Sequence, residues 1–229
     1  AAVDYGDVAL DPHSPLTIPE TIEAEARAVL EADVHLLSLG GDHFITWPLL
    51  KAHAEKYGPL ALVQFDAHQD TWADDGLKLS HGTFVGRAVR QGIVNPDRSI
   101  QVGVRTHAPE ECGIEVLSAH DVHRLTPDGI AKKIRERVGA VAAYLTFDID
   151  CLDPAFAPGT GTPVAGGLSS AQALMALAGL GDVDFVGGDV VEVSPPYDHA
   201  DITALAAATV AMHYIGLLAT RRQRTARAY

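Results

Sequence analysis

Three short segments of the chain concentrate the side-chain types that bind metal ions in proteins. Residues 40–43 read Gly-Gly-Asp-His, 66–70 read Asp-Ala-His-Gln-Asp and 148–150 read Asp-Ile-Asp, and each segment follows an apolar run. Because extended chain alternates its side chains, we expect the acidic and imidazole groups of 66–70 to share one side, and likewise the two Asp of 148–150. The predicted metal ligands are His43, Asp66, His68, Asp70, Asp148 and Asp150.

This set of four carboxylates and two imidazoles predicts a pair of bound metal ions. Carboxylates packed together in a protein interior repel one another unless a cation lies between them. Six side chains can hold two divalent ions when some carboxylates bridge, which leaves room for a bridging water. Oxygen and imidazole ligands without thiolate favour Mn²⁺, and Co²⁺, Ni²⁺ or Zn²⁺ are alternatives. Each segment alone is typical of a solvated strand end, so it is their combination that indicates metal.

The elements that must position these residues alternate along the chain. Apolar runs rich in β-branched residues predict strands, and amphipathic or Ala-rich stretches predict helices. Alternation of this kind implies right-handed βαβ units. We therefore predict an α/β fold, a three-layer α/β/α sandwich with a mostly parallel sheet, and ligands in such sheets bind beyond the carboxyl ends of the strands. The predicted strands are 34–39, 60–65, 100–104, 141–147 and 185–193, and the predicted helices include 21–31, 48–57, 128–138, 171–180 and 202–218.

Two helix starts carry a local signal. Residues 17–20, Thr-Ile-Pro-Glu, and residues 169–172, Ser-Ser-Ala-Gln, each predict a capping box, in which a hydroxyl and a carboxylate or amide satisfy backbone N–H groups at the start of the helix.

Composition limits the classes of partner. The 229 residues carry a formal net charge of -13, which argues against nucleic acid or an anionic membrane as a partner. The two cysteines, Cys112 and Cys151, have no spacing that suggests a disulfide scaffold or zinc ribbon. No apolar run approaches the length of a membrane span, and the N-terminus does not resemble a signal peptide. We expect a cytoplasmic protein with no nucleic-acid or membrane partner.

The three segments resemble the signature motifs of the ureohydrolases, a family that includes arginase and agmatinase. The third motif continues through 151–163 as Cys-Leu-Asp-Pro-Ala-Phe-Ala-Pro-Gly-Thr-Gly-Thr-Pro, which is highly specific and lacks the Lys-Ser/Thr ending of a phosphate-binding loop. The resemblance runs through essentially the whole chain. It implies the arginase-like fold, one domain over 1–229 that lacks the family's first strand segment at its N-terminus, and a homo-oligomer, either a trimer or a hexamer.

The resemblance also implies how the metal ligands divide between the two ions. Asp66 and Asp148 would bridge the ions. One Mn²⁺ would be bound by His43, Asp66, Asp70 and Asp148, and the other by Asp66, His68, Asp148 and Asp150.

Three residues would carry the chemistry. His81, in Ser-His-Gly-Thr, looks like the family's proton-shuttling histidine, and Glu192, in Val-Glu-Val-Ser-Pro, looks like the carboxylate that pairs with the substrate guanidinium. Asp70 would take the proton of the metal-activated water that attacks the guanidinium carbon. Without the family context, His81 is typical of a surface or helix-capping histidine and Glu192 of an exposed acid at a strand end.

The resemblance implies that the substrate is a guanidino compound, with agmatine, cut to putrescine and urea, as the leading choice. The amino-acid sequence of residues 144–168 and 190–193 looks most like the corresponding segments of agmatinases. Arginases carry an acid near Ala108 and an Asn in the loop before the shuttle histidine, and this chain has neither. Gln69 stands where agmatinases usually have Thr, and Lys78 could recruit a carboxylate, so guanidinobutyrate and guanidinopropionate remain alternatives.

Two rival classes are disfavoured. A non-catalytic metal-binding regulator would be expected to lose a catalytic residue, whereas Asp70, His81 and Glu192 are all retained. A deacetylase-like zinc hydrolase would need a mononuclear ligand set rather than six ligands.

Overall fold

The computed structural model describes residues 1–73, 80–110 and 112–227. Its centre is a six-stranded sheet in the order β1-β6-β5-β2-β3-β4, and every pairing is parallel. The predicted parallel α/β sheet is therefore confirmed. The strands are β1 (Leu36–Leu39), β2 (Ala61–Phe65), β3 (Ile100–Val104), β4 (Glu115–Ser118), β5 (Ala142–Asp148) and β6 (Asp184–Val191).

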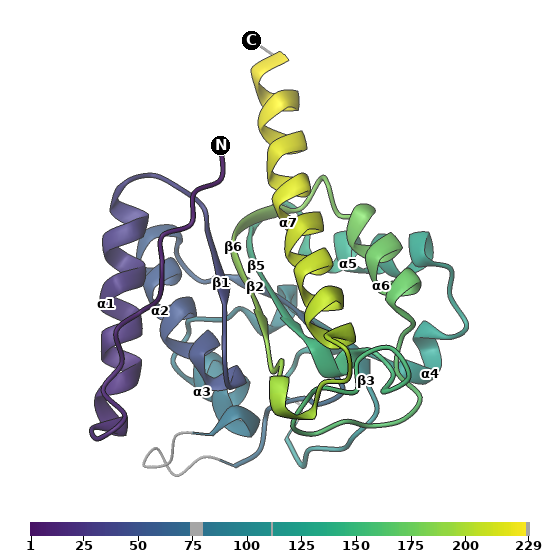
Figure 1. Cartoon of the computed structure of the whole chain (residues 1–229). Helices are drawn as coiled ribbons and strands as arrows, with labels where there is room; N and C mark the ends of the chain where they lie inside the picture. Colours follow the sequence, from purple (N-terminus) through teal and green to yellow (C-terminus); the bar gives the residue numbers. More distant parts are fainter. Residues whose placement is uncertain (74–79, 111, 228–229) are drawn as a thin grey trace.

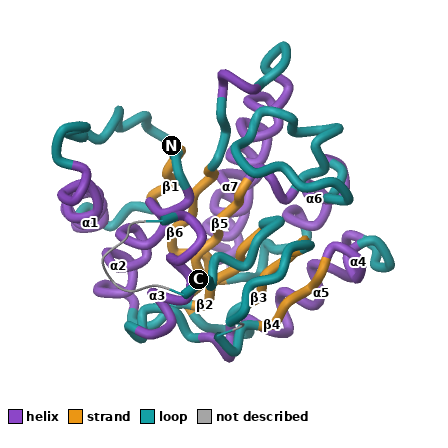
Figure 2. The backbone as a smooth tube through the Cα atoms, turned by 90° about the horizontal axis from the view of Figure 1, so that it is seen from below, coloured by secondary structure: helices purple, strands orange, loops and turns teal. Residues whose placement is uncertain are grey.

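Helices cover both faces of the sheet and make the three layers (Figures 1 and 2). Alternate residues of β2 face opposite layers: Val63 and Phe65 belong to one core cluster, whereas Leu62 belongs to the other. The first cluster packs against α4 (Ala119–Val122), α5 (Pro127–Val138), α6 (Ser170–Ala178) and α7 (Ile202–Arg227), and the second against α1 (Ile18–Glu31), α2 (Thr46–Tyr57) and α3 (Phe84–Arg90).

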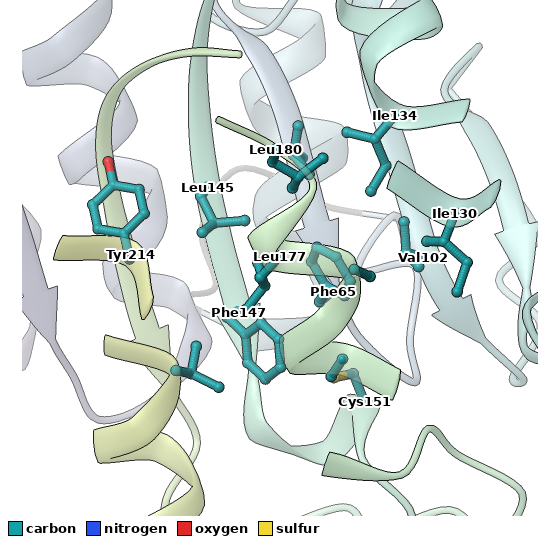
Figure 3. Close-up of a cluster of buried hydrophobic side chains, with 14 of the residues drawn as sticks. Phe65, Val102, Ile130, Ile134, Leu145, Phe147, Cys151, Leu177, Leu180 and Tyr214 are labelled. Carbon is teal, nitrogen blue, oxygen red and sulfur yellow. The ribbon is translucent and has the colours of Figure 1, made fainter. Parts of the chain in front are cut away.

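One pair of core residues fixes the spacing of the two central strand ends. Phe65 is paired in register with Phe147, and their rings stack with centroids 5.2 Å apart (Figure 3). Each phenylalanine directly precedes an aspartate, so the same register brings Asp66 and Asp148 side by side beyond the core. Cys151 lies buried in the same core cluster as these two phenylalanines.

The sequence did not predict β4. It is a four-residue strand at the edge of the sheet in which only Leu117 is buried, so it lacks the apolar run that reveals the central strands.

The long helix α7 departs from one expectation. Its segment Ile202–Thr220 is long and apolar enough to cross a membrane by length and composition, although no apolar run was expected to reach that length. Alanines between larger apolar residues extend the run. A single helix of this kind is weak evidence for a membrane span. α7 contacts β6 and α6, and Val210 and Tyr214 on its inner face join the core.

Candidate metal centre and active site

The acidic residues gather where the strands end. Asp66 follows β2 directly, Asp148 is the last residue of β5, and His43 opens a short 3-10 helix after β1. All three side chains are buried. The carboxyl ends of parallel strands meet at one edge of the sheet, which is where ligands bind in folds of this class.

The first group of side chains surrounds one nitrogen of His43. Its Nδ1 lies 3.2 Å from an oxygen of Asp66, 3.1 Å from one of Asp70 and 3.0 Å from one of Asp148. This nitrogen is buried and makes no hydrogen bond of good geometry with any residue that the structure describes. A nitrogen in that position is placed to bind a cation together with the three carboxylates.

The second group surrounds His68. Its Nδ1 lies 3.4 Å from Oδ1 of Asp66 and 3.0 Å from Oδ2 of Asp150. Asp66 thus takes part in both groups through different oxygens, Oδ2 toward His43 and Oδ1 toward His68. Asp148 is placed in the first group by its contact with His43, and its other oxygen accepts the backbone N–H of Asp150 at 2.8 Å.

The electrostatics of the cluster fit two divalent cations. Burial lowers the pKa of His43, but its contacts with three carboxylates outweigh burial and raise that pKa well above the usual value. Burial and the neighbouring charge of Asp66 raise the pKa of Asp70 to about 7. Both shifts mean that the cluster takes up protons when no metal is bound. Metal ions would supply the same positive charge.

Asp70 and Asp150 do not lie on the extended strands with alternating side chains that the sequence predicted. Asp70 has a left-handed backbone (φ 53°), and Asp150 lies in the 3-10 helix Ile149–Cys151. A hydrogen bond of 3.0 Å from the backbone N–H of Ala67 to Oδ1 of Asp150 joins the two loops. The side chains converge as predicted. Turns rather than strands place Asp70 and Asp150, because β2 ends at Phe65 and β5 ends at Asp148.

A cavity of about 310 Å³ lies over the cluster and is large enough for a small ligand. His81 lies at its exposed side, where Nδ1 is 2.8 Å from Oδ2 of Asp42. This hydrogen bond raises the pKa of His81. Other residues that line the cavity include His43, His68, Asp70, Trp72, Asp148, Thr162 and Glu192.

Glu192 reaches the cavity from just beyond β6. Its Oε1 accepts the backbone N–H of His43 at 2.7 Å, and its own backbone is left-handed (φ 66°). Strained backbone of this kind in a residue other than glycine is concentrated at functional sites. Ligand-type atoms of Asp42, His81 and Glu192 lie within 4.8 Å of one another, so the structure brings two of the three predicted catalytic side chains together.

The sequence model of the arginase family matches residues 1–216. The chain belongs to the arginase family. An agmatinase of Chromobacterium violaceum is 51% identical over 224 residues, which cover 97% of this chain and 70% of that protein.

Solved structures agree with this membership. A crystal structure described as a hypothetical agmatinase from Burkholderia thailandensis is 56% identical, has a TM-score of 0.95, and is matched over 98% of this chain and 71% of that chain. Proclavaminate amidino hydrolase from Streptomyces clavuligerus is 39% identical with a TM-score of 0.91, over 96% of this chain and 76% of its own. Both similarities extend over nearly the whole of this arginase-family chain.

In this family member, Gln69 has a structural role. The side chain is buried, and its Oε1 accepts the backbone N–H of Ala108 at 2.9 Å. The backbone oxygen of Gln69 accepts a hydrogen bond from Gln101 at 2.6 Å. Gln69 therefore fixes the loop after β3 and is not among the cavity-lining residues. Lys78, the other residue of open role, lies outside the described residues.

Sequence reasoning missed two residues that support the site. Asp42 holds His81, and its only signal was its place beside His43 in a known motif. Arg105, directly after β3, donates to the backbone oxygens of Asp150 at 2.6 Å, of Leu152 at 3.2 Å and of Val164 at 2.7 Å. It holds the loop that carries Asp150, and a lone arginine after a buried strand was the only hint.

Proposed function

We propose that this chain hydrolyses agmatine to putrescine and urea with two bound Mn²⁺ ions. The observation that carries the proposal is a single cavity in which two histidine–carboxylate groups that share Asp66 face both His81 and Glu192. The agmatinases among its relatives support the choice of substrate. In this proposal the metal ligands are His43, Asp66, His68, Asp70, Asp148 and Asp150, and the catalytic residues are Asp70, His81 and Glu192.

Two divalent ions held by these six ligands would lower the pKa of a water molecule and so would supply a nucleophile near neutral pH. Glu192 accepts hydrogen bonds from the substrate guanidinium and holds its carbon against the acidic cluster. The bond from the His43 backbone N–H fixes the orientation of that carboxylate. Asp70 accepts the proton of the attacking water. His81, at the exposed side, donates a proton to the departing nitrogen.

Agmatine fits the site better than arginine does. Arginases read the amino-acid head of their substrate with an acid near the position of Ala108. Here Ala108 is wholly buried and its N–H is bound to Gln69, so this position offers no charge to an α-amino group. A substrate without that head is therefore favoured.

We also propose that residues 1–229 form a single domain of a cytoplasmic homo-oligomer, a trimer or a hexamer. Large apolar side chains on two outer helices support assembly: Met175 of α6 is 60% exposed, and Leu205 and Met212 of α7 are 63% and 65% exposed. Analytical ultracentrifugation tests this directly, since a monomer at micromolar concentration would contradict it.

Urea release tests the proposed reaction. The Mn²⁺-loaded protein is assayed with agmatine, arginine, guanidinobutyrate and guanidinopropionate, alongside Asp150→Ala and the surface control Asp97→Ala. We expect activity chiefly on agmatine that is lost in Asp150→Ala and kept in Asp97→Ala. Preference for a guanidino acid would replace the substrate but keep the reaction. Bound metal without urea from any compound would favour the non-catalytic regulator.

Loading the metal-free protein with Mn²⁺, Co²⁺, Ni²⁺ or Zn²⁺ in turn tests the choice of metal. We expect the highest activity with Mn²⁺, because four of the six proposed ligands are carboxylates, the other two are imidazoles and none is a thiolate. Higher activity with Zn²⁺ would contradict this assignment.

A further inference from the structure

A buried chain of hydrogen bonds runs from His43 away from the cavity. Nε2 of His43 lies 2.8 Å from Oγ1 of Thr146 on β5, and that hydroxyl lies 2.6 Å from Oδ1 of Asp189 on β6. All three side chains are buried. The ring of His43 is thus connected on one side to the acidic cluster and on the other to a carboxylate that has no part in the proposed reaction.

The hydroxyl groups around Asp189 define the direction of these bonds. Oδ2 of Asp189 accepts from Tyr144 and from Thr46, each at 2.9 Å, and Oδ1 accepts from Thr146. Because Thr146 has one hydroxyl proton and donates it to Asp189, its oxygen must accept the proton of His43 Nε2. In the neutral imidazole that binds metal, the single ring proton is therefore on Nε2 and Nδ1 is free, and Nδ1 is the atom that faces the three carboxylates.

Among the described residues, no corresponding chain of hydrogen bonds lies behind His68. In the part of the chain that the structure describes, His68 contacts Asp66 and Asp150 through Nδ1, and no hydrogen bond links its Nε2 to a buried carboxylate. The two halves of the cluster are therefore supported differently.

We propose that Asp189, acting through Thr146, is a positioning residue that holds His43 in the tautomer able to bind metal. It sets the metal affinity of the centre that contains His43 and leaves the centre that contains His68 unchanged. This rests on the proposed two-metal function. Outer hydrogen-bond partners of this kind fix both the tautomer and the orientation of a ligating imidazole, and losing one typically weakens metal binding about 10- to 100-fold.

The test uses two variants that each remove one hydroxyl donor to the same carboxylate. Thr146→Val keeps the shape of the side chain but breaks the link to His43, whereas Tyr144→Phe removes a bond to Asp189 and leaves that link intact. Thr146→Ser restores a hydroxyl and serves as the rescue. Asp189 itself is not substituted, because three hydroxyl groups donate to its carboxylate and its loss would disturb the fold around all three.

Binding of Mn²⁺ to the metal-free proteins is measured by titration calorimetry, with His43→Asn and His68→Asn marking which step belongs to which centre. We expect Thr146→Val to weaken Mn²⁺ binding at the centre that contains His43, identified by His43→Asn, about 10- to 100-fold. The Mn²⁺ affinity of the centre that contains His68 should stay within threefold of the parent value. Tyr144→Phe and Thr146→Ser should bind both ions like the parent.

Four results would overturn the inference. Equal weakening of both steps in Thr146→Val, or equal effects of Thr146→Val and Tyr144→Phe, would show that the hydrogen bonds only support the fold. A parent protein that binds two Mn²⁺ and releases urea, with Thr146→Val binding equally well, would remove the inference and keep the proposed function. A parent that binds no Mn²⁺ would remove both.

Discussion

Nδ1 of His81 and Oδ2 of Asp42 share a hydrogen bond of 2.8 Å at the exposed side of the cavity. This bond is the main cause of the raised pKa of His81, and the charges of Glu192 and Asp70 add to it. If protonated His81 donates to the leaving nitrogen, kcat is high below the raised pKa and falls as pH rises through it. Asp42→Asn should shift this alkaline fall to lower pH, as a pH profile of kcat will show.

Metal content is the control for Asp42→Asn, because Asp42 is next to His43. The asparagine keeps an oxygen to accept the backbone N–H of Phe44, which Asp42 accepts at 2.9 Å, so the loop and both metal ions should be retained. An alkaline limb that stays in place while both ions remain bound would show that Asp42 does not tune His81.

A second prediction concerns His53, a histidine that does not line the cavity. His53 is buried beneath the sheet, where Nδ1 contacts the backbone oxygen of Leu49 at 2.8 Å and Nε2 has no hydrogen-bond partner among the described residues. Burial lowers its pKa to about 4. The unfolded chain binds this proton near pH 6.5 and the folded chain does not, so stability is complete above pH 6.5 and is lost as pH falls toward 4. The loss attributable to His53 is about 3 kcal/mol.

Urea denaturation between pH 4 and 7 measures this effect. His53→Gln should lower stability at pH 7 but flatten its decline with acidity relative to the parent. The exposed-histidine control, His120→Gln, should follow the parent curve. Equal slopes in His53→Gln and the parent would show that other groups, such as the acidic cluster, account for the whole decline.

Arg105 supports a third prediction. Its guanidinium reaches several backbone oxygens of the loop that follows β5, including those of Asp150 and Val164. A lysine cannot donate to all of these oxygens at once, because its ammonium is a compact group on a flexible side chain. Arg105→Lys should lower the free energy of unfolding by about 2 kcal/mol and reduce kcat about tenfold or more by misplacing Asp150.

Arg137→Lys is the matched control for Arg105→Lys. Arg137 also donates to backbone oxygens, those of Ser99 and Pro96, but it does so away from the cavity. This variant should lose stability without a comparable loss of kcat. If the two variants lose kcat equally, Arg105 has no special connection to Asp150.

The sequence was informative wherever residue type and spacing determine the structure. Parallel strands and the convergence of the Asp and His side chains follow from apolar runs that end in polar residues, and the structure has both. The predicted capping box at Ser169 and Gln172 is present. The one at Thr17 is wrong: Thr17 already has a helical backbone after the 3-10 turn Pro15–Thr17, and its hydroxyl donates to the backbone oxygen of Ser14.

The supporting residues could not be predicted, because their partners are distant in sequence. Thr146 and Asp189 contact each other only through the register of β5 with β6, and Asp42 meets His81 across 39 positions. Pattern within one segment carries no information about such pairs. The left-handed backbones of Asp70 and Glu192 are likewise set by the loops around them rather than by residue type.

Removal of metal leads to the last prediction. Asp66, Asp70, Asp148 and Asp150 are all buried within one cluster, so their mutual repulsion opposes folding unless cations or protons offset it. A ligand that binds only the folded state stabilises it by mass action. Chelation of the metal at pH 7.5 should therefore lower Tm by roughly 5–10 °C. The difference should shrink as pH falls through about 7, where Asp70 takes up a proton in the metal-free cluster.

Asp66→Asn separates this effect from general damage. Asp66 contacts both histidines, so its loss should weaken both metal centres and make Tm nearly insensitive to chelator. Asp150→Asn touches only the His68 group and should keep about half of the chelator effect, because the His43 group retains its ligands. Differential scanning fluorimetry with and without chelator gives each value. A parent Tm that does not change on chelation would contradict the prediction, since the buried carboxylates would then be accommodated without metal.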